Sequence, residues 1–241
     1  MNERSIPFPS DLIKANFVER PNRFIVRCKL DNKDIVVDAH MADPGRLKEL
    51  LIPGKPLYVK ENDDPKRKTK YSVVIVERED ASGWVSVNSM MPNKLAIIAV
   101  REQVIQTFKG WNYVRSEYPK GESRWDLLLQ KNSGRKMVVE VKGVSLLLNG
   151  IGQFPDAVTK RGAKHVLELG QIAKEDGWET SLLFVTQRED ITKIKPAVHI
   201  DPKFAQALRE AKSAGVNILA CRCSVTIEGM QVLEEIPVEV E

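Results

Sequence analysis

Three charged residues interrupt two apolar runs of the sequence, at places where the pattern otherwise predicts core. Asp126 stands before the leucines of RWDLLLQ (residues 124–130), and Glu140 and Lys142 stand among the valines of KMVVEVKGV (residues 136–144). The residues between them, KNSGR, are typical of a turn. A hairpin that pairs symmetrically about Ser133 places Asp126 opposite Glu140, and Lys142 projects from the same face because side chains alternate along a strand. We therefore predict that the three charges converge on one patch of a sheet.

Two carboxylates a cross-strand distance apart repel each other, and burial adds a desolvation cost, so a proton or a cation is expected between them. Ligands that are all oxygen favour a hard cation, Mg²⁺ or Mn²⁺. With Lys142 beside Asp126 and Glu140, such a site has the parts needed to hydrolyse a phosphodiester bond. The alternative is a set of cross-strand ion pairs on a half-exposed sheet face.

Further candidates lie around these three residues. Glu117, in the preceding strand, is a candidate metal ligand if it faces the same way as Asp126 and Glu140. Seven basic residues are candidates for contact with DNA, with a solvated surface as the alternative. They lie in the second predicted strand, beside Asp126, and on the helix that follows the glutamate strand: Arg23, Arg27, Lys29, Arg124, Lys160, Arg161 and Lys164. His165 is predicted to be structural.

The elements that must position these residues fall into two groups. The first part of the chain predicts five strands, at residues 12–20, 23–30, 34–39, 56–61 and 70–78, with a short helix from Asp43 to about Leu51; this is the order of an OB-fold barrel. The second part predicts helices at residues 93–108, 156–176 and 201–215 among strands, the order of a mixed-sheet α/β domain. We expect domains at residues 1–88 and 89–241.

The composition limits the classes of protein that the chain can belong to. Its 241 residues carry a net charge of +4, which is compatible with a nucleic-acid partner, and no apolar stretch approaches the length of a membrane span. MNERSIPFPSD lacks the apolar segment of a signal peptide, so we expect a cytoplasmic protein. The three cysteines predict neither a disulfide framework nor a zinc site.

The chain resembles the sugar fermentation stimulation protein A family over nearly its whole length. Several long blocks carry the resemblance in the same order: AHMADPGRLKELLIPG, SEYPKGESRWDLLL, VVEVKGVSL, FPDAVTKRGAKHVLEL, and HIDPKFAQAL followed by GVNILA. The resemblance implies DNA binding, an OB-like N-terminal domain and a C-terminal domain like the PD-(D/E)xK restriction endonucleases. By the family's name it also implies a link to sugar (maltose) use.

Carried over by position, the nuclease-like motif falls on Asp126, Glu140 and Lys142, with Glu117 where the family also has an acid. The sequence departs from the family pattern at three places. Gly143-Val144-Ser145 stands where Ser-Val-Thr is common, and Ile98 stands where many members have a helix glutamate. The loop at residues 40–45, HMADPG, differs from the common His-x-Pro-Asn-Thr-Gly, which puts a role for that loop in doubt.

Three functions remain open from the sequence. The first is a DNA-binding nuclease that uses Mg²⁺ or Mn²⁺. The second is a non-catalytic DNA-binding regulator that keeps the nuclease fold, and the third is a module that binds small molecules or proteins through the OB barrel and never meets DNA. We expect DNA as the partner and no membrane, and the oligomeric state stays open, a homodimer included.

Overall fold

The computed structural model describes residues 3–240, which form two compact units. The barrel unit comprises residues 6–91 and 225–230, and the sheet unit comprises residues 3–5, 92–224 and 231–240. These units differ from the predicted ranges 1–88 and 89–241 mainly because a short piece near each end of the chain belongs to the other unit. Among the described residues, no helix combines the length and the apolar character that a membrane span requires.

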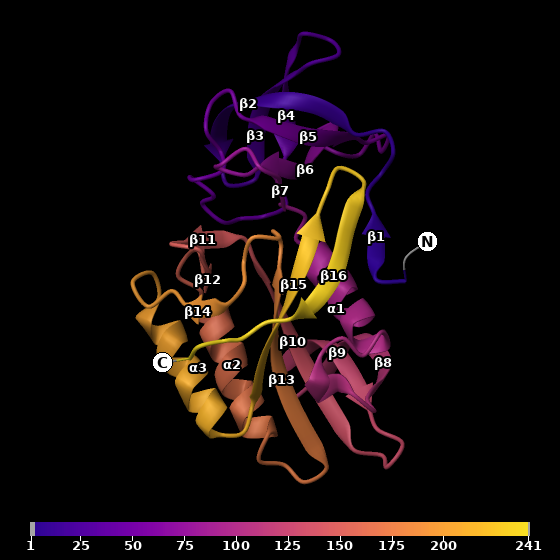
Figure 1. Ribbon diagram of the computed structural model, residues 1–241, viewed down its shortest axis with the longest axis vertical. Coiled ribbons are helices and arrows are strands. Elements are labelled where there is room, and N and C mark those ends of the chain that lie inside the picture. The colour runs from indigo at the N-terminus through magenta and orange to yellow at the C-terminus, as the bar shows by residue number, and fades with distance from the viewer. Residues whose placement is uncertain (1–2, 241) are drawn as a thin grey trace. The chain divides into compact units, whose positions relative to one another are not determined.

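The barrel unit is a closed barrel of five strands in the order β4-β3-β2-β5-β6, which closes because β4 also pairs with β6 (Figure 1). A short further strand, β7, extends the sheet beside β6. The strands are β2 (Ile13–Asn22), β3 (Ile25–Leu30), β4 (Val36–His40), β5 (Pro56–Glu61), β6 (Tyr71–Glu77) and β7 (Trp84–Ser86). All five predicted strands are present, and the prediction of an OB-like barrel is confirmed.

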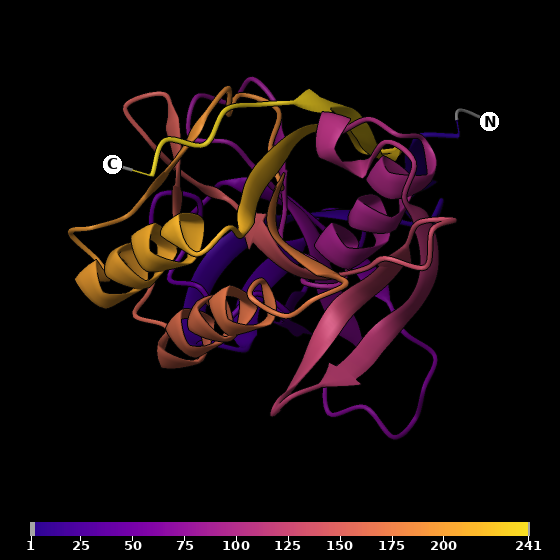
Figure 2. The same ribbon diagram turned by 90° about the horizontal axis from the view of Figure 1, so that it is seen from below.

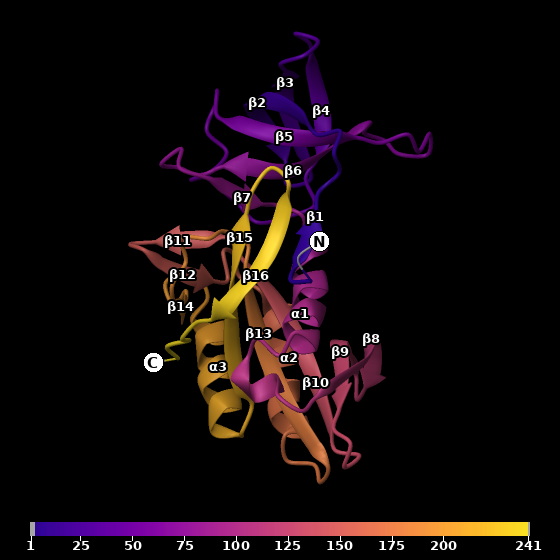
Figure 3. The same cartoon turned by 45° about the vertical axis from the view of Figure 1, so that its right-hand side comes forward.

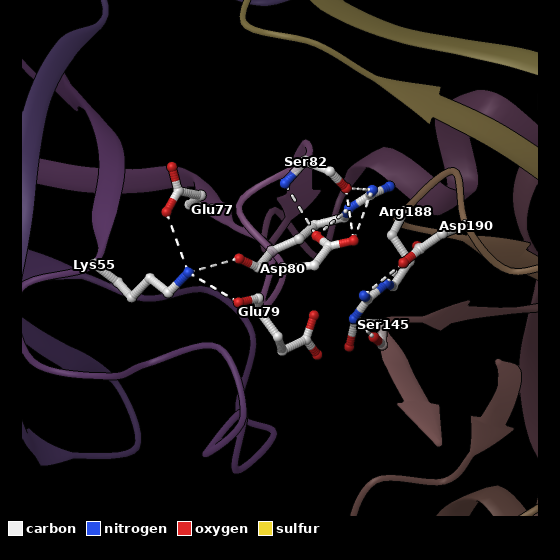
Figure 4. A network of polar contacts seen from close by, with 9 residues as sticks. Lys55, Glu77, Glu79, Asp80, Ser82, Ser145, Arg188 and Asp190 are labelled. Carbon is white, nitrogen blue, oxygen red and sulfur yellow. Dashed lines mark hydrogen bonds and ion pairs between the residues drawn. The ribbon is translucent and has the colours of Figure 1, made fainter. Parts of the chain in front are cut away.

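Alternation along the strands builds the interior of the barrel. In β3, Val26, Cys28 and Leu30 are fully buried, whereas Arg27 and Lys29 between them point outward. At the surface of the same unit, Lys55 donates to Glu77 and to the carbonyls of residues 78 and 79, as Figure 4 shows. Figure 3 shows the same strands from a second direction.

The helix predicted from Asp43 to about Leu51 is wrong, because that segment forms only turns. Gly45 in its first turn has low helix propensity, and Pro53 and Gly54 lie just beyond its end. Leu47 also has a φ of +46°, which a right-handed helix cannot accommodate. The amides of Leu50 and Leu51 both bond to the Leu47 carbonyl, so a single turn remains.

The sheet unit contains a seven-stranded sheet in the order β1-β16-β15-β13-β10-β9-β8. Strands β10, β13 and β15 are parallel to one another, and β8 and β9 continue the sheet in antiparallel pairing. The bounds are β1 (Ser5–Pro7), β8 (Asn112–Lys120), β9 (Ser123–Gln130), β10 (Lys136–Val144), β13 (Trp178–Thr186), β15 (Asn217–Val225) and β16 (Gly229–Glu235). The mixed sheet that the sequence predicted is therefore confirmed.

Three helices cover this sheet. Helices α2 (Lys160–Ile172) and α3 (Pro202–Ser213) pack against each other on one face, and α1 (Met91–Arg101) lies on the opposite side (Figure 2). Val166 of α2 and Phe204 of α3 belong to the same buried cluster as Phe184 of β13. In the same unit the buried Arg188 pairs with Asp190 through two nitrogens (Figure 4).

The helix ends differ from the predicted ranges. Helix α1 ends at Arg101, and a separate 3₁₀ turn, η1, covers Gln106–Phe108. Helix α2 begins after Thr159, whose hydroxyl accepts from the Gly162 amide, rather than at Asp156. A small sheet of β11 (Leu146–Leu148), β12 (Ile151–Phe154) and β14 (Ile194–Pro196) was not predicted, although Asn149-Gly150 between β11 and β12 is a strong hairpin signal.

The β9–β10 hairpin has the predicted register. Leu127 pairs with Val139, and Gln130 pairs with Lys136, symmetrically about Ser133. The turn is closed by the Lys131 amide, which donates to the Arg135 carbonyl, and Gly134 has a φ of +87°. This register decides which residues of the two strands face each other at the candidate site.

Replacing Gly134 by alanine should destabilise the protein by about 1–2 kcal/mol, because an L side chain disfavours the left-handed backbone of this turn. Space is not the cause, since a Cβ at Gly134 meets no atom within 4 Å. The measurement is the free energy of unfolding in urea. Ser133→Ala, in the same exposed turn, is the control and should change it by no more than about 0.5 kcal/mol. Equal stability of Gly134→Ala and the wild type would contradict the prediction.

Candidate active site

The ladder between β9 and β10 ends just before Asp126. Its last pair is Leu127 with Val139, and the same register would next bond the Val141 amide to the backbone of Trp125. Instead, the Val141 amide donates to Oδ2 of Asp126 at 2.7 Å. The Asp126 carboxylate thus substitutes for a backbone acceptor at the point where the two strands separate.

A second donor holds the other oxygen of Asp126. Asn93, near the start of α1, donates from Nδ2 to Oδ1 at 2.8 Å. Burial raises the pKa of Asp126, the negative charge of Glu140 raises it further, and the bonds from Val141 and Asn93 oppose both effects. Asn93 was not among the predicted site residues, because its distance from Asp126 along the chain carries no signal.

Glu140 is only 3 % exposed, and two donors converge on its Oε1. Lys142 Nζ lies at 2.5 Å and His165 Nδ1 at 2.7 Å from that oxygen. Burial alone would raise the pKa of Glu140, but the bonds and charges of His165 and Lys142 together outweigh burial and lower it. Among the described residues, no hydrogen bond reaches Oε2 of Glu140.

The predicted meeting of Asp126, Glu140 and Lys142 is therefore present in the structure. The charge of Glu140 acts on Asp126, and Lys142 bonds directly to Glu140. His165, which the sequence analysis assigned a structural part, touches Glu140 and belongs to the site. The sequence indicated only that His165 lies within the basic cluster of the predicted helix.

Glu117 lies opposite Asp126 in the backbone register, between the pairs Ser116 with Leu127 and Tyr118 with Trp125. Its φ is +56°, and its side chain is 60 % exposed and pairs with Arg124 at 3.8 Å. The side chain of Glu117 is thus directed to Arg124, and no group of three or more ligand-type side chains forms within residues 3–240. Its part as a metal ligand stays a prediction.

The predicted DNA contacts divide between the two units. In the barrel unit Arg23 lies over the ring of Phe24, Arg27 pairs with Glu19 and Asp38, and Lys29 pairs with Asp34. In the sheet unit the exposed Lys160, Arg161 and Lys164 occupy the first turns of α2, and Lys164 pairs with Glu122 and Glu168. Only Arg161 is linked to the acidic site, because its Nε bonds to His165.

The donor set fits a hard divalent cation. Mg²⁺ commonly takes one or two carboxylates from the protein and fills its other positions with water and substrate phosphate oxygens. Asp126 and Glu140 supply two neighbouring carboxylates, one of which has an oxygen without a hydrogen bond. Burial is the main cause of the raised pKa of Asp126, and repulsion by Glu140 adds to it; that repulsion is the interaction that a bound cation would relieve.

Comparisons with known proteins match both parts of the chain to the same family. Residues 18–87 match the family described as the SfsA N-terminal OB domain, and residues 90–229 match the sugar fermentation stimulation protein RE domain. A sugar fermentation stimulation protein homolog of Shouchella clausii is 41% identical over 95% of this chain and 98% of its own length. One from Moorella thermoacetica is 39% identical over 91% and 93%. The solved structure of Pyrococcus furiosus SfsA in complex with Ca²⁺ is 28% identical, with a TM-score of 0.85 over 97% of this chain and 98% of that chain.

Asn93→Ala should lower the free energy of unfolding by about 1–3 kcal/mol, because it leaves a partly buried carboxylate oxygen of Asp126 without its donor. Urea unfolding in the presence of EDTA measures the change without a contribution from bound cations. The matched control is Lys94→Ala, at the next and exposed position of α1, which should stay within about 0.5 kcal/mol of the wild type. An equal loss in both variants would show that the helix, and not the bond to Asp126, is responsible.

Proposed function

This chain belongs to the sugar fermentation stimulation protein family, and we propose that it binds DNA and hydrolyses phosphodiester bonds at a divalent-cation site. Asp126 and Glu140 hold the cation, and Lys142 acts at the scissile phosphate. The observation that carries the proposal is a partly buried carboxylate, Asp126, placed beside a buried carboxylate, Glu140, at the separation of β9 and β10. A site that served only the fold has no need of two neighbouring acids, since burying them costs free energy.

Mg²⁺ or Mn²⁺ is the cation that we propose, and Glu117, on the neighbouring strand, would join as a third acid on release from its pair with Arg124. When bound, such a cation polarises a phosphate oxygen and lowers the pKa of a coordinated water. The Ca²⁺ in the related Pyrococcus furiosus structure supports a hard cation that prefers oxygen ligands. Lys142 supplies a positive charge within the same site, where it stabilises negative charge that develops on the phosphate.

The DNA backbone meets the sheet unit at the start of α2. Lys160, Arg161 and Lys164 are exposed there, and His165 on the same helix reaches Glu140, so this basic helix end is close to the acids. Arg124, on the site strand β9, is a further phosphate contact. We also propose that residues 1–88 act as the nucleic-acid-binding domain through Arg23, Arg27 and Lys29, and that residues 89–241 carry the nuclease-like site.

A DNA-binding regulator without catalytic turnover is the second candidate. It is favoured by the 2.5 Å bond between Lys142 and Glu140, which uses a carboxylate oxygen that a cation could otherwise take. The acidic partners of Arg27, Lys29 and Lys164 offset part of the basic surface under either function. The two functions differ in whether DNA is cut when a cation is supplied.

Asp126→Ala and Lys142→Ala should each lower the rate of DNA cleavage by about 100-fold or more while DNA binding persists. The test incubates labelled single-stranded, duplex and branched DNA with the full-length protein and Mg²⁺, Mn²⁺ or EDTA, and follows both binding and cutting. Lys174→Ala, an exposed lysine of the sheet unit, is the control for loss of a positive charge. Binding of DNA without cutting in any cation would reject the catalytic function and favour the regulator.

Mn²⁺ should raise the melting temperature of the wild type but not of Asp126→Ala, because a ligand that binds only the folded state stabilises it. At a concentration 100 times the Kd the gain is about 2.7 kcal/mol. Differential scanning calorimetry over a Mn²⁺ series, with Lys174→Ala as the reference variant, measures the effect. An equal rise in the wild type and Asp126→Ala would place the cation elsewhere.

A further inference from the structure

His165 uses both nitrogens of its ring, and both bonds lead to residues of the site. It lies on α2 and is only 6 % exposed. Its Nδ1 is 2.7 Å from Oε1 of Glu140, and the Nε of Arg161 lies 3.3 Å from its Nε2. The ring of Trp125, the residue before Asp126, packs beside it with the ring centres 5.7 Å apart.

These two bonds assign the proton of the ring. The Nε of Arg161 always carries hydrogen and can only donate, so Nε2 of His165 must accept and carries no proton. Nδ1 therefore holds the proton and donates it to the Glu140 carboxylate. The His165 ring is thus held in one orientation from both sides.

The bond from His165 also fixes the orientation of Glu140. A carboxylate with a single bond to Lys142 could still rotate about its terminal torsion, which is a soft one. Donation to the same Oε1 from two directions, by Lys142 and by the rigid His165 ring, removes that freedom. Within residues 3–240 no hydrogen bond reaches Oε2, so that oxygen is left for a ligand.

We propose that His165, oriented by Arg161, is a positioning residue that holds Oε1 of Glu140 so that Oε2 is presented to a divalent cation. The inference rests on the proposed function, because it concerns how Glu140 holds that cation. His165 acts through Glu140 and does not touch the substrate. Partners of this kind that orient a metal ligand commonly change metal affinity by about 10- to 100-fold when they are lost.

A purely structural role for His165 predicts a different effect of its loss on cation affinity. A buried ring that only fills space between α2 and Trp125 would affect the stability of the fold and leave the affinity of the folded protein for a cation unchanged. Asparagine and leucine separate the two, since they have nearly the same shape. Asparagine can place an amide donor near the position of Nδ1, whereas leucine has no donor.

The test measures Mn²⁺ affinity by electron paramagnetic resonance of the free ion, on full-length wild type, His165→Asn, His165→Leu and the exposed α2 control Gln171→Ala. We expect His165→Leu to bind Mn²⁺ about 10- to 100-fold more weakly, with His165→Asn and Gln171→Ala close to the wild type. Equal affinity of the wild type and folded His165→Leu would overturn the inference alone. A wild type that binds no Mn²⁺ would instead overturn the proposed function, and the inference with it.

The ring proton gives a second measurement that does not depend on a stable leucine variant. The chain has three histidines, so the ¹⁵N side-chain spectrum is simple, and loss of one set of signals in His165→Asn assigns His165. We expect the Nδ1–H form, with the second nitrogen unprotonated. The Nε2–H form would overturn the inference, because the bonds to Arg161 and Glu140 could not both exist.

Discussion

The bond from the Val141 amide to the Asp126 carboxylate is the interaction on which the candidate site depends. It stands where an antiparallel ladder would pair two backbone groups, so the end of the β9–β10 ladder leaves no unsatisfied amide at that point. The same bond draws a carboxylate into the sheet, next to Glu140. The strands therefore separate at the same point where the partly buried Asp126 carboxylate enters the sheet.

The surroundings shift the pKa values of the two carboxylates of the site in opposite directions. Asp126 has two neutral donors and a negative neighbour, so burial dominates and its pKa is raised. Glu140 has Lys142 and His165, whose bonds and charges outweigh burial and lower its pKa. Neighbouring acids with divergent pKa values are typical of functional sites, because each environment is built from specific partners and not from burial alone.

The sequence determined the elements that alternation and turn residues specify. The five barrel strands, the register of the β9–β10 hairpin and the α3 helix were predicted, because each follows from local patterns of apolar side chains and from the KNSGR turn. The helix predicted at residues 43–51 is wrong because the backbone leaves the helical region at Leu47, whose φ is +46°. The small sheet that contains β11 and β12 was missed despite its Asn149-Gly150 turn.

The sequence by itself also determined that Asp126, Glu140 and Lys142 would meet, since the hairpin that joins them is local. Only the tertiary structure brought Asn93 and His165 to them, because α1 and α2 pack on the sheet through contacts that no spacing in the chain encodes. It also decided the direction of Glu117, which the backbone register places opposite Asp126. There its positive φ and its pairing with Arg124 turn the side chain to the surface.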